Sequence, residues 1–212
     1  MKQLDMVNKM YALIRKDKET NEEAFEAMIA FVASKFTFKA AVNIPWIKMD
    51  TLNALNEIFK LEVLQEDPWD WFGELDTKLK LGLFDKNLLI GQSVLEKVAD
   101  KLKLPNKSIE PNSVLDDNAY TGRNIIEMWK KDKNTIFYGV ESDLLAYRVA
   151  LVNMRCYGIP SSIIFGNSFE HDVRPFSPNW RDANVWEPNK NRITIAETDE
   201  RLRKIDGFHR IV

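Results

Sequence analysis

Hydrophobic positions in the first half of the chain recur every three or four residues. In the first such stretch they are Leu4, Val7, Met10, Tyr11 and Ile14. This spacing places apolar side chains on one face of a helix, and similar patterns continue to about residue 104. We therefore expect residues 1–104 to form a mainly helical N-terminal region.

The pattern changes after a polar, proline-containing segment at residues 103–107. Three short apolar runs follow, at residues 114–115, 136–140 and 163–165, and stretches with helical spacing separate them. A strand–helix–strand–helix–strand order with short connections is typical of a parallel sheet built from βαβ units. The pattern predicts an α/β protein with a second region at residues 105–212, whose proline-rich end after Phe169 is expected to be an irregular extension.

Several helix starts are marked by capping residues. Thr20 and Glu23 have the spacing of a capping box. Asp50, Ser93 and Asp143 each precede a run with helical spacing, and each is a residue type that caps helix N-termini. We expect Asp143 to cap the helix 144–157, which contains the single cysteine, Cys156, on its apolar face.

Polar residues end each of the three expected strands. They are Asp116, Glu141 and Asn167. In open parallel sheets, ligands bind at the carboxyl ends of the strands, so these three side chains are expected at one binding edge.

Charge and composition narrow the classes of function. The 212 residues carry a net charge of −2, which gives no overall positive field to attract nucleic acid. One cysteine excludes an intramolecular disulfide. Apolar runs are too short for a membrane span, so we expect a cytoplasmic protein with no membrane partner.

The order of the motifs resembles the adenine-N6 DNA methyltransferases of the type I restriction-modification family, which use S-adenosylmethionine. The resemblance covers roughly residues 69–169. It lies in the segments WFGEL (71–75), GQ (91–92), DDNAYTGR (116–123), YGVESDLLAYRVA (138–150) and GNSF (166–169). It implies a partial Rossmann-like sheet of the S-adenosylmethionine methyltransferase type.

The resemblance also implies roles for five residues. Asp116 and Gly122 would hold the amino-acid end of S-adenosylmethionine, and Glu141 would accept hydrogen bonds from its ribose hydroxyls. Asn167 and Gln92 would contact its adenine.

Each of these roles has an alternative. Glu141 could be a solvated carboxylate or a helix cap, Gly122 an ordinary turn glycine, and Gln92 part of a simple loop. Asp116 with Asp117 has the residue types of a metal site, but no third ligand lies at suitable spacing, and we expect no metal. Tyr120 replaces a glycine of the family's loop, and its ring could either fill the cofactor pocket or stack on the ligand.

One motif of the family is absent from this sequence: the Asn-Pro-Pro-Phe-type tetrapeptide that holds the target adenine. The resemblance therefore implies a DNA adenine-N6 methyltransferase-like protein whose own catalysis is in question. The alternative is a non-catalytic interaction or regulatory module of a mobile-element or restriction system. DNA is the implied partner, together with another protein chain or a second copy of this one.

Overall fold

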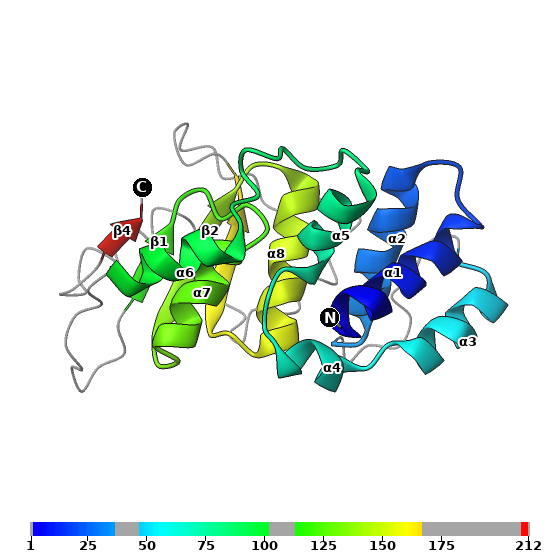
Figure 1. The fold of residues 1–212 in the computed structure, drawn as a ribbon, viewed down its shortest axis with the longest axis horizontal. Coiled ribbons are helices and arrows are strands. Elements are labelled where there is room, and N and C mark those ends of the chain that lie inside the picture. The colour runs from blue at the N-terminus through cyan, green and yellow to red at the C-terminus, as the bar shows by residue number, and fades with distance from the viewer. Residues whose placement is uncertain (1, 37–46, 102–112, 167–208, 212) are drawn as a thin grey trace.

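The computed structural model describes residues 2–36, 47–101, 113–166 and 209–211. The N-terminal region is helical, as predicted (Figure 1). Its helices are α1 (Lys2–Arg15), α2 (Asn21–Ser34), α3 (Met49–Ile58), α4 (Leu61–Glu66), α5 (Trp71–Leu79) and α6 (Gln92–Lys101). The second region contains β1 (Ser113–Asp116), α7 (Arg123–Lys131), β2 (Ile136–Glu141), α8 (Leu144–Tyr157), β3 (Ser161–Phe165) and β4 (His209–Ile211). The boundary predicted at residues 103–107 lies outside the described residues.

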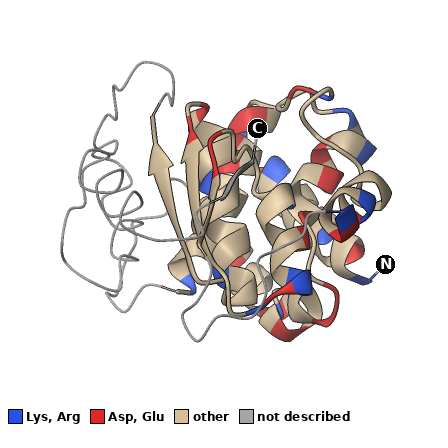
Figure 2. Ribbon diagram, turned by 90° about the vertical axis from the view of Figure 1, so that its left-hand side faces the viewer, with Lys and Arg blue, Asp and Glu red and all other residues tan. Residues whose placement is uncertain are grey.

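The strands form a parallel sheet in the order β3-β2-β1-β4. This is the arrangement of the first four strands of a doubly wound Rossmann sheet. Because both βαβ crossovers run in the same direction across the sheet and such crossovers are right-handed, α7 and α8 cover the same face. Figure 2 shows the described helices on one side of the strands. The predicted fold class, a helical region with a partial Rossmann-like sheet, is confirmed.

Local capping chemistry explains where several helices begin. The capping box predicted at α2 is present: the Glu23 backbone N–H donates to Thr20 Oγ1 at 3.1 Å, and Glu23 Oε2 accepts from the Thr20 backbone N–H at 3.3 Å. Asp143 caps α8 as predicted, since its Oδ1 accepts from the Ala146 backbone N–H at 2.7 Å. These contacts satisfy backbone donors that have no partner within the helix.

Two other predicted caps are wrong. The helix α3 begins at Met49 with Lys48 in the cap position, so Asp50 lies inside the first turn, where a negative charge still favours the helix dipole. The helix α6 begins at Gln92, one residue before Ser93, and the Gly91 carbonyl accepts its first backbone hydrogen bonds from Val94 and Leu95.

The N-terminal helices and the helix α8 share one hydrophobic core. Helices α2 and α4 both pack on α8. The Gln65 side chain donates to the Cys156 carbonyl at 2.9 Å, and Arg148 pairs with Glu26 at 2.7 Å. Cys156 is buried, as expected, and burial raises the pKa of its thiol. None of the helices in the described ranges combines the length and apolar content that a membrane span requires.

The close contact at Gly139 in β2 leads to a stability prediction. A Cβ added at this position would lie 2.6 Å from Ile163 Cδ1 and 2.9 Å from Ala119 Cβ. Ala119 cannot retreat easily, because its backbone N–H donates to the Val140 carbonyl at 3.0 Å. We expect Gly139→Ala to lower the free energy of unfolding by about 1–3 kcal/mol, measured by chemical denaturation.

The control for this substitution is Gly91→Ala. A Cβ at Gly91 would meet nothing within 4 Å. We expect a change smaller than about 1 kcal/mol. Equal effects of the two substitutions would show that the contact of Gly139 with Ile163 and Ala119 does not restrict this position.

Candidate functional site

Asp116 and Glu141 lie at the same edge of the sheet. They are the last residues of β1 and β2, which pair in parallel with Asp116 opposite Gly139. Both side chains are buried. Figure 2 shows acidic positions gathered at one end of the strands, whose lengths are mainly uncharged. Asn167, the third residue predicted at this edge, lies outside the described residues, and the ligand-binding roles of all three stay predictions.

Glu141 holds the loop between β1 and α7 in place. Its Oε2 accepts from the backbone N–H of Tyr120 at 2.7 Å, and its Oε1 accepts from the backbone N–H of Asp143 at 2.6 Å. Burial raises the pKa of this carboxyl group, while its backbone hydrogen bonds oppose the shift. Glu141 is therefore neither a solvated carboxylate nor the cap of α8. The backbone N–H of Ser142 also interacts with this carboxylate, which has about four acceptor positions, so one position remains for a ligand hydroxyl.

The loop 117–122 has two residues in the left-handed region, Tyr120 at φ 48° and Gly122 at φ 85°. A Cβ at Gly122 would lie 2.8 Å from Met154 Cε on α8. The left-handed φ favours glycine here, whereas the terminal methyl of Met154 can shift, so the contact with α8 does not by itself require glycine, and the cofactor-binding role of Gly122 stays a prediction. Gly122 is also the N-cap residue of α7. Because glycine has no side chain, it offers no side-chain acceptor to the backbone N–H groups of the first helical turn.

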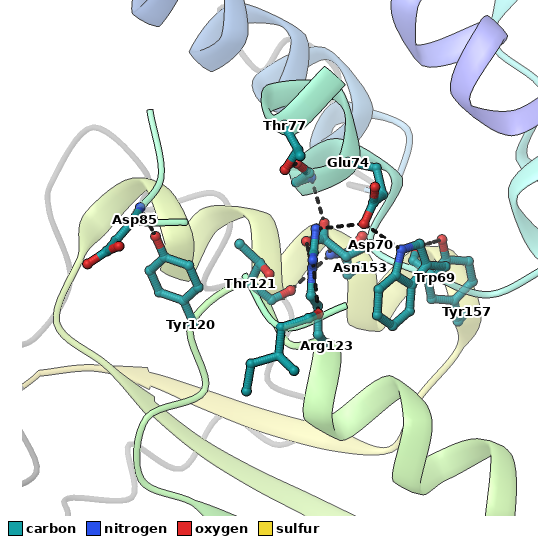
Figure 3. Close-up of polar contacts among 12 residues, drawn as sticks. Trp69, Asp70, Glu74, Thr77, Asp85, Tyr120, Thr121, Arg123, Asn153 and Tyr157 are labelled. Atoms are coloured by element: carbon teal, nitrogen blue, oxygen red, sulfur yellow. Dashed lines mark hydrogen bonds and ion pairs between the residues drawn. The ribbon is translucent and has the colours of Figure 1, made fainter. Parts of the chain in front are cut away.

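The Tyr120 ring contacts the segment that precedes α6. Its hydroxyl accepts from the Asp85 backbone N–H at 2.6 Å (Figure 3). Its ring lies edge-to-face against Phe84, with 5.9 Å between the ring centroids. Burial raises the pKa of the phenol to about 12, so the hydroxyl stays neutral at physiological pH. The Tyr120 side chain therefore connects the loop to residues 84–85, whereas its backbone N–H donates to Glu141.

Asp116 is held inside the loop. Its Oδ1 accepts from the Asn118 backbone N–H and its Oδ2 from the Asn124 side-chain amide, both at 3.2 Å. Burial raises the pKa of its carboxyl group to about 6, although these hydrogen bonds oppose the shift. Within the described ranges, no group of three His, Cys, Asp or Glu side chains is arranged to hold a metal ion.

Gln92 begins α6 and is half-buried. Two residues earlier, the Ile90 carbonyl accepts from Arg123 Nη1 at 3.1 Å. Because Arg123 directly follows the loop, this bond brings the segment before Gln92 towards the loop.

Sequence reasoning missed a buried polar cluster behind the loop (Figure 3). Arg123 Nε pairs with Asp70 Oδ2 at 2.9 Å, and the Asn153 side-chain amide donates to Asp70 Oδ1 at 3.0 Å and to the Thr121 carbonyl at 2.9 Å. We call Asp70, Arg123 and Asn153 the loop clamp. Asp70 directly precedes the segment 71–75, Arg123 ends the segment 116–123 and Asn153 lies three residues after the segment 138–150. Arg123 and Asn153 are 53 and 83 residues from Asp70, and such separations gave no signal that the three side chains meet.

Comparison with known proteins supports the fold assignment. The sequence matches no protein-family model and no curated protein. The structure is similar to a Listeria monocytogenes protein assigned as a class I S-adenosylmethionine-dependent methyltransferase. The TM-score is 0.62 at 14% sequence identity, and the match covers 97% of this chain and 69% of that protein.

A second match is the methyltransferase subunit of a type I restriction-modification system from Streptococcus thermophilus. Its TM-score is 0.35 at 12% identity, with 83% of this chain and 53% of that one covered, and a similarity this low supports no conclusion about fold or function. The first match and the strand order define the fold of this chain as that of the class I S-adenosylmethionine-dependent methyltransferases.

The raised pKa of Asp116 predicts a pH dependence of stability. Its pKa is about 6 in the fold, against an ordinary value of 3.8, so the folded state binds the proton more tightly than the unfolded state. Stability from this group is therefore present at low pH and is lost as pH rises through about 4 to 6.

We expect the contribution of Asp116 to the free energy of unfolding to be on the order of 2 kcal/mol larger at a pH near 4.5 than at one near 7. Asp116→Asn should remove that part of the pH dependence, as measured by urea denaturation at both pH values. The same pH dependence in wild type and variant would mean that Asp116 does not have the raised pKa.

Proposed function

We propose that this chain binds S-adenosylmethionine at the edge where β1 and β2 end, and that it takes part in methylation of the N6 amino group of adenine in DNA. The observation that carries the proposal is the position of Glu141. Glu141 is an acid at the end of β2 and contacts the loop 117–122, in which Tyr120 and Gly122 have left-handed backbone conformations. This loop leads into the N-terminus of α7, which has no side-chain cap. Class I methyltransferase folds place the cofactor at this edge.

The residues at this edge fit the chemistry of the methyl donor. The acceptor position that the backbone contacts leave on the Glu141 carboxylate suits a ribose hydroxyl. Backbone N–H groups at the start of α7 suit the cofactor's carboxylate, because helix N-termini favour negative charge. Asp116 lies beside them and would orient the loop through Asn118 and Asn124. Gln92 and Asn167 are assigned to the adenine from the sequence resemblance.

When bound, S-adenosylmethionine supplies an electrophilic methyl group on its sulfonium, and an adenine amino group attacks that methyl group in line. The contribution of the protein to such a reaction is position more than acid–base chemistry. An adenine in duplex DNA would first have to be flipped out and held by its amino group. The tetrapeptide that does this in the resembled family is absent from the sequence. We therefore assign these residues the cofactor-binding part of the reaction, and the adenine-binding part to a segment outside them, for which a partner chain is the case tested below.

The charge distribution favours a partner. Lys130, Lys131 and Lys133 are the nearest approach to a basic patch in the expected sheet region, and they lie at or just after the far end of α7, away from the strand edge. Lys130 pairs with Glu127 and Lys131 with Asp100, both at 2.5 Å. Since acids neutralise these two lysines, this cluster is poorly suited to guide DNA to the edge. With a net charge of −2 the sequence gives no overall positive field, so DNA would have to be held by a local basic patch outside this cluster or by a partner chain.

Cofactor binding is tested by calorimetry with S-adenosylhomocysteine, which avoids turnover. We expect micromolar binding by the wild type and a roughly 10- to 100-fold weaker affinity for Glu141→Gln, because a hydrogen bond to a charged group contributes about 1.5–3 kcal/mol. The matched control is Glu127→Gln, which changes another buried glutamate, on α7, whose pKa burial also raises. The control should bind like wild type. No binding heat from the wild type at millimolar ligand would refute the proposal and leave a non-catalytic interaction module as the better interpretation.

Methyl transfer is tested with radiolabelled S-adenosylmethionine and unmethylated DNA. Because the adenine-holding tetrapeptide is missing, we expect no labelled DNA from the purified chain alone. Labelling should appear when a co-purifying chain with an Asn-Pro-Pro-Phe-type segment is added. Labelled adenine from the chain alone would show that other residues of this chain hold the base and that no partner is needed.

A further inference from the structure

A buried ion pair lies directly behind the loop that we propose binds the cofactor. Asp70 is fully buried and Arg123 is 5% exposed. The Asp70 carboxylate accepts from Arg123 Nε at 2.9 Å, from Asn153 Nδ2 at 3.0 Å and from the Gly73 backbone N–H at 2.9 Å. Burying two charges costs several kcal/mol per ion unless such contacts are complete, and a hydrophobic replacement is often at least as stable. A contribution to stability alone is therefore a weak explanation for a buried ion pair between Asp70 and Arg123.

The loop clamp fixes the backbone on both sides of Gly122. Arg123 is the first residue of α7, and its guanidinium also reaches the Ile90 carbonyl at 3.1 Å and Glu74 at 3.2 Å. On the other side of Gly122, the Thr121 carbonyl accepts from Asn153 at 2.9 Å. Tyr120, with its left-handed φ of 48°, has a conformation that a non-glycine residue keeps only when its surroundings enforce it.

The clamp draws its parts from three segments that are distant in sequence (Figure 3). Asp70 caps α5 in the N-terminal region, Arg123 begins α7, and Asn153 lies within α8. Trp69, next to Asp70, lies under the Arg123 guanidinium at 5.0 Å and takes a hydrogen bond on its carbonyl from Tyr157. Any shift of α5 would therefore be transmitted to the loop.

The clamp region also contains incompletely bonded polar atoms. Thr121 Oγ1, Asn153 Oδ1 and Arg123 Nη2 are buried without a hydrogen-bond partner among the described residues, although Nη2 is close enough to Glu74 for an ion pair. Buried groups of this kind are rare in native structures, and strain, a functional role or an ordered water accounts for them where they occur.

We propose that the loop clamp is the positioning element of the cofactor loop, so that binding of the nucleoside methyl donor depends on the N-terminal helical region. This inference rests on the proposed function. Asp70, Arg123 and Asn153 are positioning residues: they act on the ligand by holding Tyr120, Thr121 and Gly122 where the Glu141 carboxylate and the α7 N-terminus can be used together.

The test compares two buried arginines that both join the N-terminal region to the sheet region. Arg123→Lys keeps the positive charge beside Asp70 but loses the fork that reaches Ile90 and Glu74. Arg148→Lys is the matched control: Arg148 is 6% exposed and joins α8 to Glu26 of α2. Asn153→Ala is a second clamp variant, which removes the bond to Thr121 and decides the matter if Arg123→Lys does not fold.

Two measurements are made on each full-length variant: affinity for S-adenosylhomocysteine, and hydrogen exchange of individual amides. For both clamp variants we expect roughly 10- to 100-fold weaker affinity, because each substitution removes one or two hydrogen bonds that hold the loop and involve charged groups. The amides of Ala119, Tyr120 and Gly122 should exchange at least about 10-fold faster, whereas amides in α1 and α2 keep wild-type rates. Arg148→Lys should bind within about two-fold of wild type and leave exchange in the loop unchanged.

Each alternative result has a definite meaning. Wild-type affinity in both clamp variants would overturn the inference. Equal loss of affinity in Arg148→Lys, with faster exchange throughout the chain, would also overturn it, because a general loss of stability would then explain the effect. If the wild type itself binds no S-adenosylhomocysteine, the proposed function fails, and loop exchange in the variants still shows independently whether the clamp holds the loop.

Discussion

The charge of Arg123 constrains how the two regions of this chain fit together. A guanidinium cannot be buried without acceptors, and the three that Arg123 contacts, Asp70, Glu74 and the Ile90 carbonyl, all come from the N-terminal helical region. Because Arg123 begins the helix that follows β1, satisfying its charge brings that region against the end of the sheet. The apolar contacts of α2 and α4 with α8 then complete the same packing from the side of the core.

This packing gives the carboxyl edge of the sheet a particular form. The loop 117–122 is held by Glu141 through the Tyr120 backbone, by Asn153 through the Thr121 carbonyl and by residues 84–85 through the Tyr120 side chain. In open parallel sheets ligands bind at the carboxyl ends of the strands, and this is the edge where we propose that the cofactor binds. Glu141 fixes the loop, and under the proposed function the same carboxylate would also accept hydrogen bonds from the ribose.

The fold was largely predictable because its signals are local. Apolar runs and helical spacing placed β1, β2 and β3 and the helices between them, and the caps of α2 and α8 were correct because a cap depends on residues within one turn. The caps at Asp50 and Ser93 were wrong, since each helix begins earlier than its favoured capping residue. In both helices the residue at the N-cap position, Lys48 or Gly91, has little or no ability to cap with its side chain. The sequence therefore does not mark where these helices begin.

The candidate site was only partly predictable. Placing Asp116 and Glu141 at one edge followed from the sequence, because adjacent parallel strands end on the same side. The sequence by itself determined the order of the elements, the residues at the strand ends and the absence of the adenine-holding tetrapeptide. Tertiary structure alone decided that the Tyr120 ring turns to Phe84, that Glu141 accepts backbone N–H groups, and that Asp70 meets Arg123 and Asn153. Periodicity and capping act over a few residues, whereas the partner of a buried polar group is chosen among all segments that packing brings together.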